Sequence, residues 1–329
     1  MKDYYVFSEG ELKRKDNTIY FINENNNKKA LPIEQVDNLY VFNNITINSK
    51  FINLINKYNI CVHFFNYYGF YSGSFYPREI NNSGYVLVRQ SSNYLNNNKR
   101  LFIAKCFIKS GVHHIIRNLR KYKDKEGIIN LINIMKDYSN SIEKIDSISG
   151  LMGIEGNIRQ IYYQSFNIIL NNQLFSFKTR TKRPPEDPIN ILISFGNSIM
   201  YTTVLSEIYK THLNPTISYL HEPSTKRFSL SLDIAEIFKP LIIDSLIFHL
   251  INNRMINKNH FKFIEGLCFL NEEGKKKFIA EYDKKLSTTI YHRTLKRKVS
   301  YKYLIRLECY KLIKHLIEDK VYKPLKAWW

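Results

Sequence analysis

The sequence predicts an α+β protein in which a small N-terminal β-rich domain precedes a larger all-α C-terminal domain. Up to about residue 78, short apolar and aromatic runs alternate with polar turns, as in strands. From about residue 94, apolar residues recur every three or four positions, as in helices. Between the two patterns, the chain-breaking run 81–84 (Asn-Asn-Ser-Gly) predicts a linker. We therefore expect domains at 1–78 and 94–329, joined by a linker at 79–93.

Within the first domain, five short runs predict strands and one amphipathic segment predicts a helix. The helix is expected over Lys50–Tyr58, where apolar residues share one face. Residues Glu24–Lys29 are expected to form a polar loop. The strands are expected at Tyr4–Phe7, Thr18–Ile22, Leu39–Phe42, Cys61–Phe65 and Phe70–Phe75.

The remaining chain predicts a series of helices. One of them is expected to begin at Pro188 with Asp187 as its cap. Pro240 lies inside another apolar pattern and predicts a kink there. The expected helices cover Leu95–Ile108, Val112–Tyr122, Gly127–Ser139, Ser141–Asp146, Leu151–Leu170, Asn190–Leu205, Leu230–Asn252, Leu267–Lys285 and Tyr301–Leu316.

Charge is the most informative feature of the composition. The chain has 49 Lys and Arg against 29 Asp and Glu, a formal charge of +20, which predicts salt-sensitive binding to polyanions. Nucleic acid and an anionic membrane surface both fit, and the 24 tyrosines favour nucleic acid because tyrosine stacks on bases. Four scattered cysteines and the absence of a signal-peptide pattern lead us to expect a cytoplasmic protein that is not inserted in a membrane.

The segment 220–244 is the first candidate site. His221 lies in a turn before an amphipathic helix, and Asp233 and Glu236 are three residues apart on that helix. A proline-induced bend beside a carboxylate suits a site. Two interpretations remain open for these residues alone, because acids on a helix most often form a solvated face.

Two other segments add candidates. Glu155 lies between Gly153 and Gly156 in an expected helix, which predicts close approach of a ligand or of another helix. A basic loop that is rich in proline follows at 178–188. Five cations that flank the candidate site in sequence are expected to contact DNA phosphates. These cations are Arg180, Lys182, Arg183, Lys226 and Arg227.

Several of these motifs, in this order, resemble one family, the CRISPR-associated adaptation integrases, which are the endonucleases of spacer acquisition. The resemblance covers essentially the whole chain. It rests on Gly153–Gly156 (GIEG), Arg183–Gly196 (RPPEDPINILISFG), Leu220–Pro223 (LHEP), Arg227–Pro240 (RFSLSLDIAEIFKP), Glu273–Phe278 (EGKKKF) and Tyr303–Arg306 (YLIR).

The resemblance implies both an activity and a site. Such proteins insert short foreign DNA as new spacers into a CRISPR array, by attack of 3′-hydroxyl ends on phosphodiesters, and nick DNA with Mg²⁺ or Mn²⁺. It implies Glu155, His221 and Glu236 as the catalytic metal ligands, with Asp233 as an accessory acid at the periphery. It also implies a homodimer, built through the β domain, that joins a small second adaptation subunit as a heterohexamer.

Two alternatives compete with a metal-dependent nuclease and integrase. In the first, the chain is a non-catalytic architectural DNA-binding protein whose acids form a solvated face. In the second, weaker alternative it is a polybasic peripheral membrane protein, although a basic amphipathic anchor with Trp on its apolar face is missing from the pattern. A metal-dependent cleavage assay separates the first alternative from the enzyme.

Overall fold

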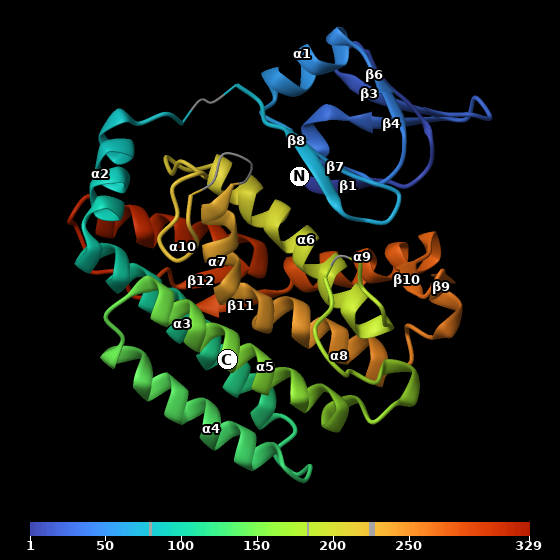
Figure 1. Ribbon diagram of the computed structural model, residues 1–329. Coiled ribbons are helices and arrows are strands. Elements are labelled where there is room, and N and C mark those ends of the chain that lie inside the picture. The colour runs from blue at the N-terminus through green and yellow to red at the C-terminus, as the bar shows by residue number, and fades with distance from the viewer. Residues whose placement is uncertain (79–80, 183, 224–227) are drawn as a thin grey trace. The chain divides into compact units, whose positions relative to one another are not determined.

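The computed structural model describes residues 1–78, 81–182, 184–223 and 228–329, in two compact units (Figure 1). The first unit is Met1–Asn82 and the second is Ser83–Trp329. The first is built on β-sheets and the second is mostly helical, so the predicted fold class is confirmed. The second unit also contains two short β-hairpins, which the prediction of an all-α domain missed.

Two four-stranded sheets form the first unit. One has the order β1-β5-β7-β8, with β1–β5 and β5–β7 parallel and β7–β8 antiparallel. Each of its strands overlaps a predicted run, and both faces of β5 are largely buried, as in a central parallel strand. The strands are β1 (Lys2–Val6), β5 (Val36–Val41), β7 (Cys61–Phe65) and β8 (Tyr71–Phe75).

The second sheet has the order β4-β3-β2-β6, and only β3 was predicted. The expected loop at Glu24–Lys29 overlaps the start of β4. Strand β2 carries four charged residues in six, so it lacks the apolar run that indicates a strand, and Leu12 alone anchors it in the core. The elements are β2 (Gly10–Lys15), β3 (Thr18–Asn23), β4 (Lys28–Pro32), β6 (Ile45–Ile47) and the packed helix α1 (Ser49–Lys57).

The second unit starts inside the expected linker. Helix α2 (Gly84–Leu95) begins directly after Ser83, whose hydroxyl accepts a hydrogen bond from the N–H of Val86 at 3.3 Å. The helical unit therefore begins about ten residues earlier than expected. Residues 79–80 of the expected linker lie outside the described chain.

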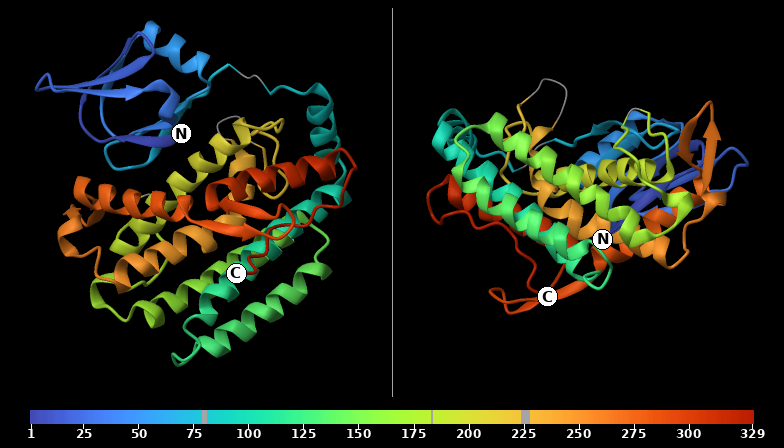
Figure 2. Two further views of the ribbon diagram at one scale, coloured as in Figure 1. Left: turned by 180° about the vertical axis from the view of Figure 1, so that it is seen from behind. Right: turned by 60° about the horizontal axis from the view of Figure 1, so that its bottom comes forward.

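Long helices packed side by side make the core of this unit. Helix α3 (Asn97–Arg120) runs through Gly111 without a break and merges two expected helices. It packs against α4 (Ile128–Ser141), α5 (Ile148–Leu170) and α7 (Ser229–Phe238), and Figures 1 and 2 show α3, α4 and α5 running together. Single 3₁₀ turns of this unit occur at Ile142–Lys144, Gln173–Phe175 and Lys258–His260, and the first unit has one at Ile33–Gln35.

Helix α6 (Pro188–Tyr209) begins as predicted. Asp187 caps it by accepting a hydrogen bond from the N–H of Asn190 at 2.8 Å. By length and composition α6 could cross a membrane, which the sequence prediction overlooked. Its most apolar 18-residue window is 83% buried inside the protein, as in the central helix of a folded core.

Pro240 interrupts the next helix by widening it. After α7 the chain forms a π-helical segment, Lys239–Asp244, and then α8 (Ser245–Asn252). Proline cannot donate to the carbonyl of Glu236, so a wider turn replaces the missing bond. This segment turns Lys239 and Asp244 into the interior, where both are buried.

The last third of the unit departs most from expectation. The expected helix Leu267–Lys285 is wrong at its start, because β9 (Phe261–Ile264) and β10 (Leu267–Leu270) form a hairpin before α9 (Glu272–Ser287). A second hairpin, β11 (Thr289–His292) and β12 (Arg297–Ser300), precedes α10 (Tyr301–Leu316), which has the predicted bounds. The β9–β10 turn uses Gly266 at φ +77°, a conformation that favours glycine.

Candidate active site

Asp233 on α7 fixes the loop that carries His221. Its carboxylate is fully buried and accepts hydrogen bonds from the backbone N–H groups of Tyr219 at 2.6 Å, Leu220 at 2.9 Å and His221 at 3.0 Å. It also lies 2.7 Å from Nδ1 of His221. One acid therefore sets both the loop conformation and the ring orientation.

This geometry leaves Nε2 of His221 as the nitrogen that can take a ligand. The His221 side chain is 23% exposed, whereas Asp233 behind it is inaccessible. Burial lowers the pKa of His221, but the hydrogen bond and charge of Asp233, with a further contribution from Glu236, raise it above its ordinary value overall. Glu236 thus lies within electrostatic reach of the ring.

Asp233 contacts His221 from the buried side and is itself inaccessible to solvent. Asp233 is among the most enclosed acids of the unit and acts through His221. We therefore assign it as a positioning residue.

Asp233→Asn is expected to disturb function through His221. An uncharged amide with one acceptor oxygen cannot receive all of these hydrogen bonds. We expect the free energy of unfolding to fall by ~2–3 kcal/mol and the pKa of His221 to fall. Chemical denaturation and an NMR titration of the His221 ring measure the two effects. Asp146→Asn, at an exposed position, is the control, and an unchanged His221 pKa in Asp233→Asn would contradict this role.

Arg159 on α5 joins the two predicted carboxylate ligands. Its Nε lies 3.2 Å from Glu155, one helical turn earlier on α5, and its Nη2 lies 2.6 Å from Glu236 on α7. Its Nη1 lies 3.8 Å from Asp244 of the π-helical segment. Burial disfavours the Arg159 charge, but Glu236, Glu155 and Asp244 outweigh it and hold the pKa of Arg159 above its ordinary value.

A second cation engages Glu236. The ammonium group of Lys239 donates to Glu236 Oε1 and lies 5.0 Å above the ring of Tyr201. Burial raises the pKa of Glu236, but Lys239 and Arg159 outweigh burial and hold it well below its usual range. Glu236 is therefore anionic at neutral pH although it is only 5% exposed.

The structure brings together the three segments that carry Glu155, His221 and Glu236. The two carboxylates share one guanidinium, and Glu236 also interacts with His221. Their oxygens do not converge on one point: among the described residues, no three His, Cys, Asp or Glu side chains form a group that could hold a metal ion. The ligand assignment therefore stays a prediction.

Sequence reasoning missed the cations and the third acid of this cluster. The Glu155–Arg159 spacing of four residues is a visible helical ion-pair signal. Nothing in the sequence indicates that Asp244 turns inward, because that depends on the wide turn after Pro240. Burial, opposed by Arg159 and Lys239, raises the pKa of Asp244 to about 6. Its Oδ2 is buried and has no hydrogen-bond partner in the described part of the chain.

Open space lies next to Glu155. A Cβ atom added to Gly153 or Gly156 would meet no atom within 4 Å. These glycines are therefore not explained by tight packing against another helix, one of the two readings of the sequence. Gly111 of α3 differs, since its Cβ would lie 3.0 Å from the carbonyl oxygen of Glu236. There a glycine lets α3 approach α7 directly below the site.

The candidate phosphate contacts fall into different environments. Arg180 is turned inward, where it donates to Asn190 Oδ1 at 2.8 Å and to Ser194 Oγ at 2.9 Å and so holds the loop against α6. Lys182 is exposed. Predicted contacts outside the described residues are Arg183, Lys226 and Arg227.

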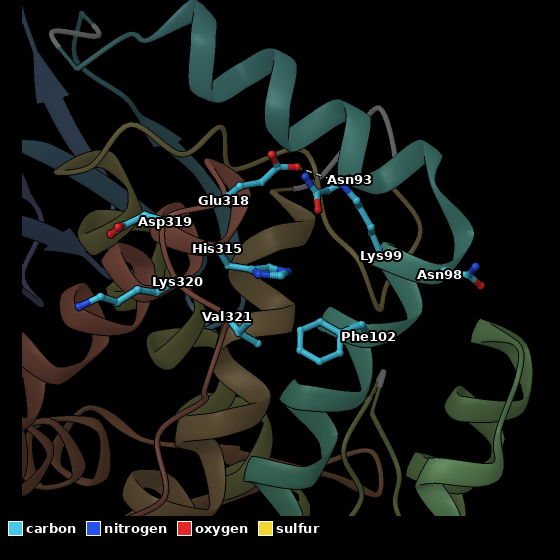
Figure 3. A pocket seen from close by; sticks show the side chains of 9 residues that line it. All are labelled: Asn93, Asn98, Lys99, Phe102, His315, Glu318, Asp319, Lys320 and Val321. Atoms are coloured by element: carbon cyan, nitrogen blue, oxygen red, sulfur yellow. Dashed lines mark hydrogen bonds and ion pairs between the residues drawn. The ribbon is translucent and has the colours of Figure 1, made fainter.

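A cavity of about 550 Å³ lies elsewhere, at the N-terminal part of α3 and the chain after α10 (Figure 3). Phe102, His315 and Val321 form part of its wall, and Lys99 pairs with Glu318 at 3.2 Å beside it. None of the predicted site residues lines this cavity.

These features define a class of two-part α+β proteins. One unit is built on β-sheets, and the other is mostly helical and carries a cluster of acids beside a histidine. The chain belongs to the family described as CRISPR associated protein Cas1, whose model matches residues 4–284. It is 57% identical over 330 residues to the CRISPR-associated endonuclease Cas1 of Clostridium perfringens, covering 100% of this chain and 99% of the relative. It is 54% identical to a CRISPR-associated endonuclease Cas1 of Thermodesulfovibrio yellowstonii, with complete coverage of both.

Solved structures agree with this assignment. A Cas1 protein from Thermotoga maritima has a TM-score of 0.90 at 42% identity, covering 98% of this chain and 99% of that chain. A casposase bound to integration product has a TM-score of 0.87 at 18% identity, covering 100% of this chain and 94% of that chain. At that identity the second likeness shows the fold alone.

Proposed function

We propose that this chain is a metal-dependent DNA endonuclease and integrase of CRISPR adaptation. It inserts short foreign DNA segments as new spacers into a CRISPR array by 3′-hydroxyl attack on phosphodiesters. The observation that supports this most directly is the cluster of Glu155, Arg159 and Glu236 beside a histidine oriented by a buried acid. The endonuclease names of close relatives support the same activity.

The chemistry of the donors fits a divalent cation. Glu155, His221 and Glu236 would hold Mg²⁺ or Mn²⁺, and an imidazole among carboxylates suits Mn²⁺ at least as well as Mg²⁺. A bound cation supplies Lewis acidity at the phosphodiester. Glu155 and His221 are each 23% exposed at the side chain, so both are reachable from solvent.

The chain's own residues prepare the site in three ways. Asp233 orients the His221 ring so that Nε2 is the ligating nitrogen. Arg159 and Lys239 keep Glu236 ionised, since their charges oppose its burial. The absence of side chains at Gly153 and Gly156 leaves room beside Glu155 for a DNA backbone. The net charge of +20 favours binding of two DNA substrates.

We also propose that the chain acts as a homodimer joined to a small second adaptation subunit in a heterohexamer. Two solved structures named as Cas6-RT-Cas1–Cas2 complexes contain a chain with this fold at 17% identity. Those complexes combine a Cas1-like part with Cas2, which supports a Cas2 partner for this chain. Light scattering of the chain alone and mixed with that subunit tests both stoichiometries.

Removal of divalent cations tests the proposed enzyme. We expect strand transfer into a repeat-containing plasmid with Mn²⁺ or Mg²⁺, and none with excess EDTA, because the carboxylates alone cannot stabilise the charge that develops on phosphate. DNA binding in EDTA, followed by fluorescence anisotropy, should remain. Cation-independent cleavage would contradict the metal site. Tight binding without cleavage under any cation would favour the architectural alternative.

A further inference from the structure

The β11–β12 hairpin and the adjoining ends of α9 and α10 form a stretch that is rich in positive charge. From residue 284 to residue 307 the chain has no Asp or Glu. Within the hairpin itself, Arg293 and Arg297 are exposed. The cations in this stretch are Lys284, Lys285, Arg293, Lys296, Arg297, Lys298, Lys302 and Arg306. A surface that solvates well usually mixes both signs of charge, so this stretch is unusual.

Aromatic rings, rather than carboxylates, support four cations here. Arg293 lies 5.4 Å from the ring of Trp328, and Arg297 lies 5.4 Å from that of Tyr303. Lys285 of α9 lies 5.2 Å from the ring of Tyr301, and Arg117 of α3 lies 6.0 Å from that of Trp329. We call these four cations and four rings the cation–aromatic face.

Three rings of this face, those of Tyr301, Trp328 and Trp329, contact one another. Trp329 packs edge-on against Trp328 at 4.8 Å and against Tyr301 at 5.7 Å. Its Nε1 donates to the Tyr301 hydroxyl at 2.6 Å. In Figure 2 the C-terminal residues run beside the β11–β12 hairpin. Arg117 of α3, Lys285 of α9 and Arg293 of the hairpin thus meet around these three rings.

Three of the four cations of the face have no acidic partner within the described residues, and the fourth, Arg117, donates to the main-chain oxygen of Trp329. Lys285, Arg293 and Arg297 form no ion pair there with Asp or Glu, and the nearby Glu308 is buried and paired with Lys311 at 2.5 Å. Burial together with Lys121 and Arg117 lowers the pKa of Lys285 to about 8. The neighbours of this lysine therefore disfavour its charge, and a bound anion would relieve that cost.

We propose that the cation–aromatic face binds the phosphodiester backbone of duplex DNA. A guanidinium resting on a ring keeps its N–H donors in the ring plane available, and its fork fits phosphate oxygens. Backing by rings also fixes the cations, so less side-chain entropy is lost on binding. The choice of DNA rests on the proposed function, but binding here requires no metal.

Tryptophan fluorescence provides a local test, because both tryptophans of the chain, Trp328 and Trp329, belong to this face. With the full-length protein in EDTA, a mixed-sequence 30-bp duplex should change Trp fluorescence over the same concentration range as it raises anisotropy. The double variant Arg293→Gln/Arg297→Gln should make the slope of log affinity against log salt shallower by ~2, because each lost phosphate contact contributes ~0.9 to the slope. Arg293→Lys/Arg297→Lys should retain most of the slope.

The control Lys123→Gln/Lys136→Gln removes the same amount of charge at two exposed positions, Lys136 on α4 and Lys123 before it. The slope of log affinity against log salt should change by well under ~1 in this control. Circular dichroism verifies that each variant is folded. DNA binding with unchanged Trp fluorescence and equal slopes in both Gln variants would overturn this inference and leave the proposed function intact. No DNA binding by the wild type would overturn both. Arginine-dependent binding of phosphatidylserine vesicles, without any fluorescence response to DNA, would assign the face to a membrane instead.

Discussion

Glu155→Gln is expected to abolish strand transfer, by at least ~10³-fold or about 4 kcal/mol of transition-state stabilisation. The substitution removes one ligand charge from the proposed cation site but keeps the shape of the side chain. Stability should change little, because Glu155 is partly exposed and its described ion pair is the one with Arg159. DNA binding should remain or become slightly tighter, since one negative charge is lost near the backbone.

Three comparisons make this result interpretable. Glu236→Gln should lose activity equally but also lose stability, because Lys239 then lacks its buried acidic partner and Arg159 keeps only Glu155 and Asp244. His221→Ala should lose activity with DNA binding retained. Glu273→Gln, at a side chain that is 78% exposed, is the control. Strand transfer by Glu155→Gln at the wild-type rate would end the metal-site hypothesis and revive the architectural one.

The fold class was predictable because each unit has its own pattern of apolar residues. Short apolar runs between polar turns mark the first unit, and apolar residues at every third or fourth position mark the second. Strand β7 and helix α10 were predicted with the observed bounds, since their apolar residues lie on the faces that become buried. Strands β2 and β12 were not predicted. Each is rich in charge and is held largely by pairing with a neighbouring strand, since only Leu12 of β2 and Val299 of β12 are buried. Such strands depend on the tertiary fold, which one sequence does not display.

The candidate site was predictable only at the level of residue types. Glu155, His221 and Glu236 were identified by resemblance, and the structure brings their segments together. Their relation through Arg159 could not be predicted, since it requires α5 and α7, which both pack against α3, to bring these side chains within reach of one another. The role of Asp233 depended on the path of the loop at 219–221, where three backbone N–H groups point at one carboxylate. Loop paths of this kind leave no periodic signal.

Arg159→Met is expected to lower the free energy of unfolding by ~3–5 kcal/mol. Methionine keeps much of the buried volume but leaves Glu155, Glu236 and Asp244 without the guanidinium between them. Glu236 then keeps Lys239 as its only cation, and the buried Glu236 and Asp244 repel each other and cannot recover the water that they lost on folding. Urea denaturation at pH 7.5 measures the loss. Arg14→Met, on strand β2 where the side chain is exposed, is the matched control.

The pH dependence identifies how Asp244 contributes. Burial raises the pKa of Asp244 from its ordinary value of 3.8 to about 6 in the folded protein. Between about pH 4 and pH 6 the folded state therefore binds more protons than the unfolded state does. The buried charge of Asp244 therefore does not lower the free energy of unfolding below about pH 4, and it lowers that free energy by its full amount above about pH 6. Without Arg159 this pKa should rise further, and Arg159→Met should recover stability on acidification more steeply than the wild type does.

Asp244→Asn in the Arg159→Met background separates this account from a packing defect. The amide removes one of the three negative charges, so the double variant should regain part of the lost stability and show a shallower pH slope between pH 4.5 and 7.5. A simple packing defect would give the same loss at every pH and no recovery from Asp244→Asn. Equal stability of Arg159→Met and the double variant across this range would exclude repulsion among the acids as the cause.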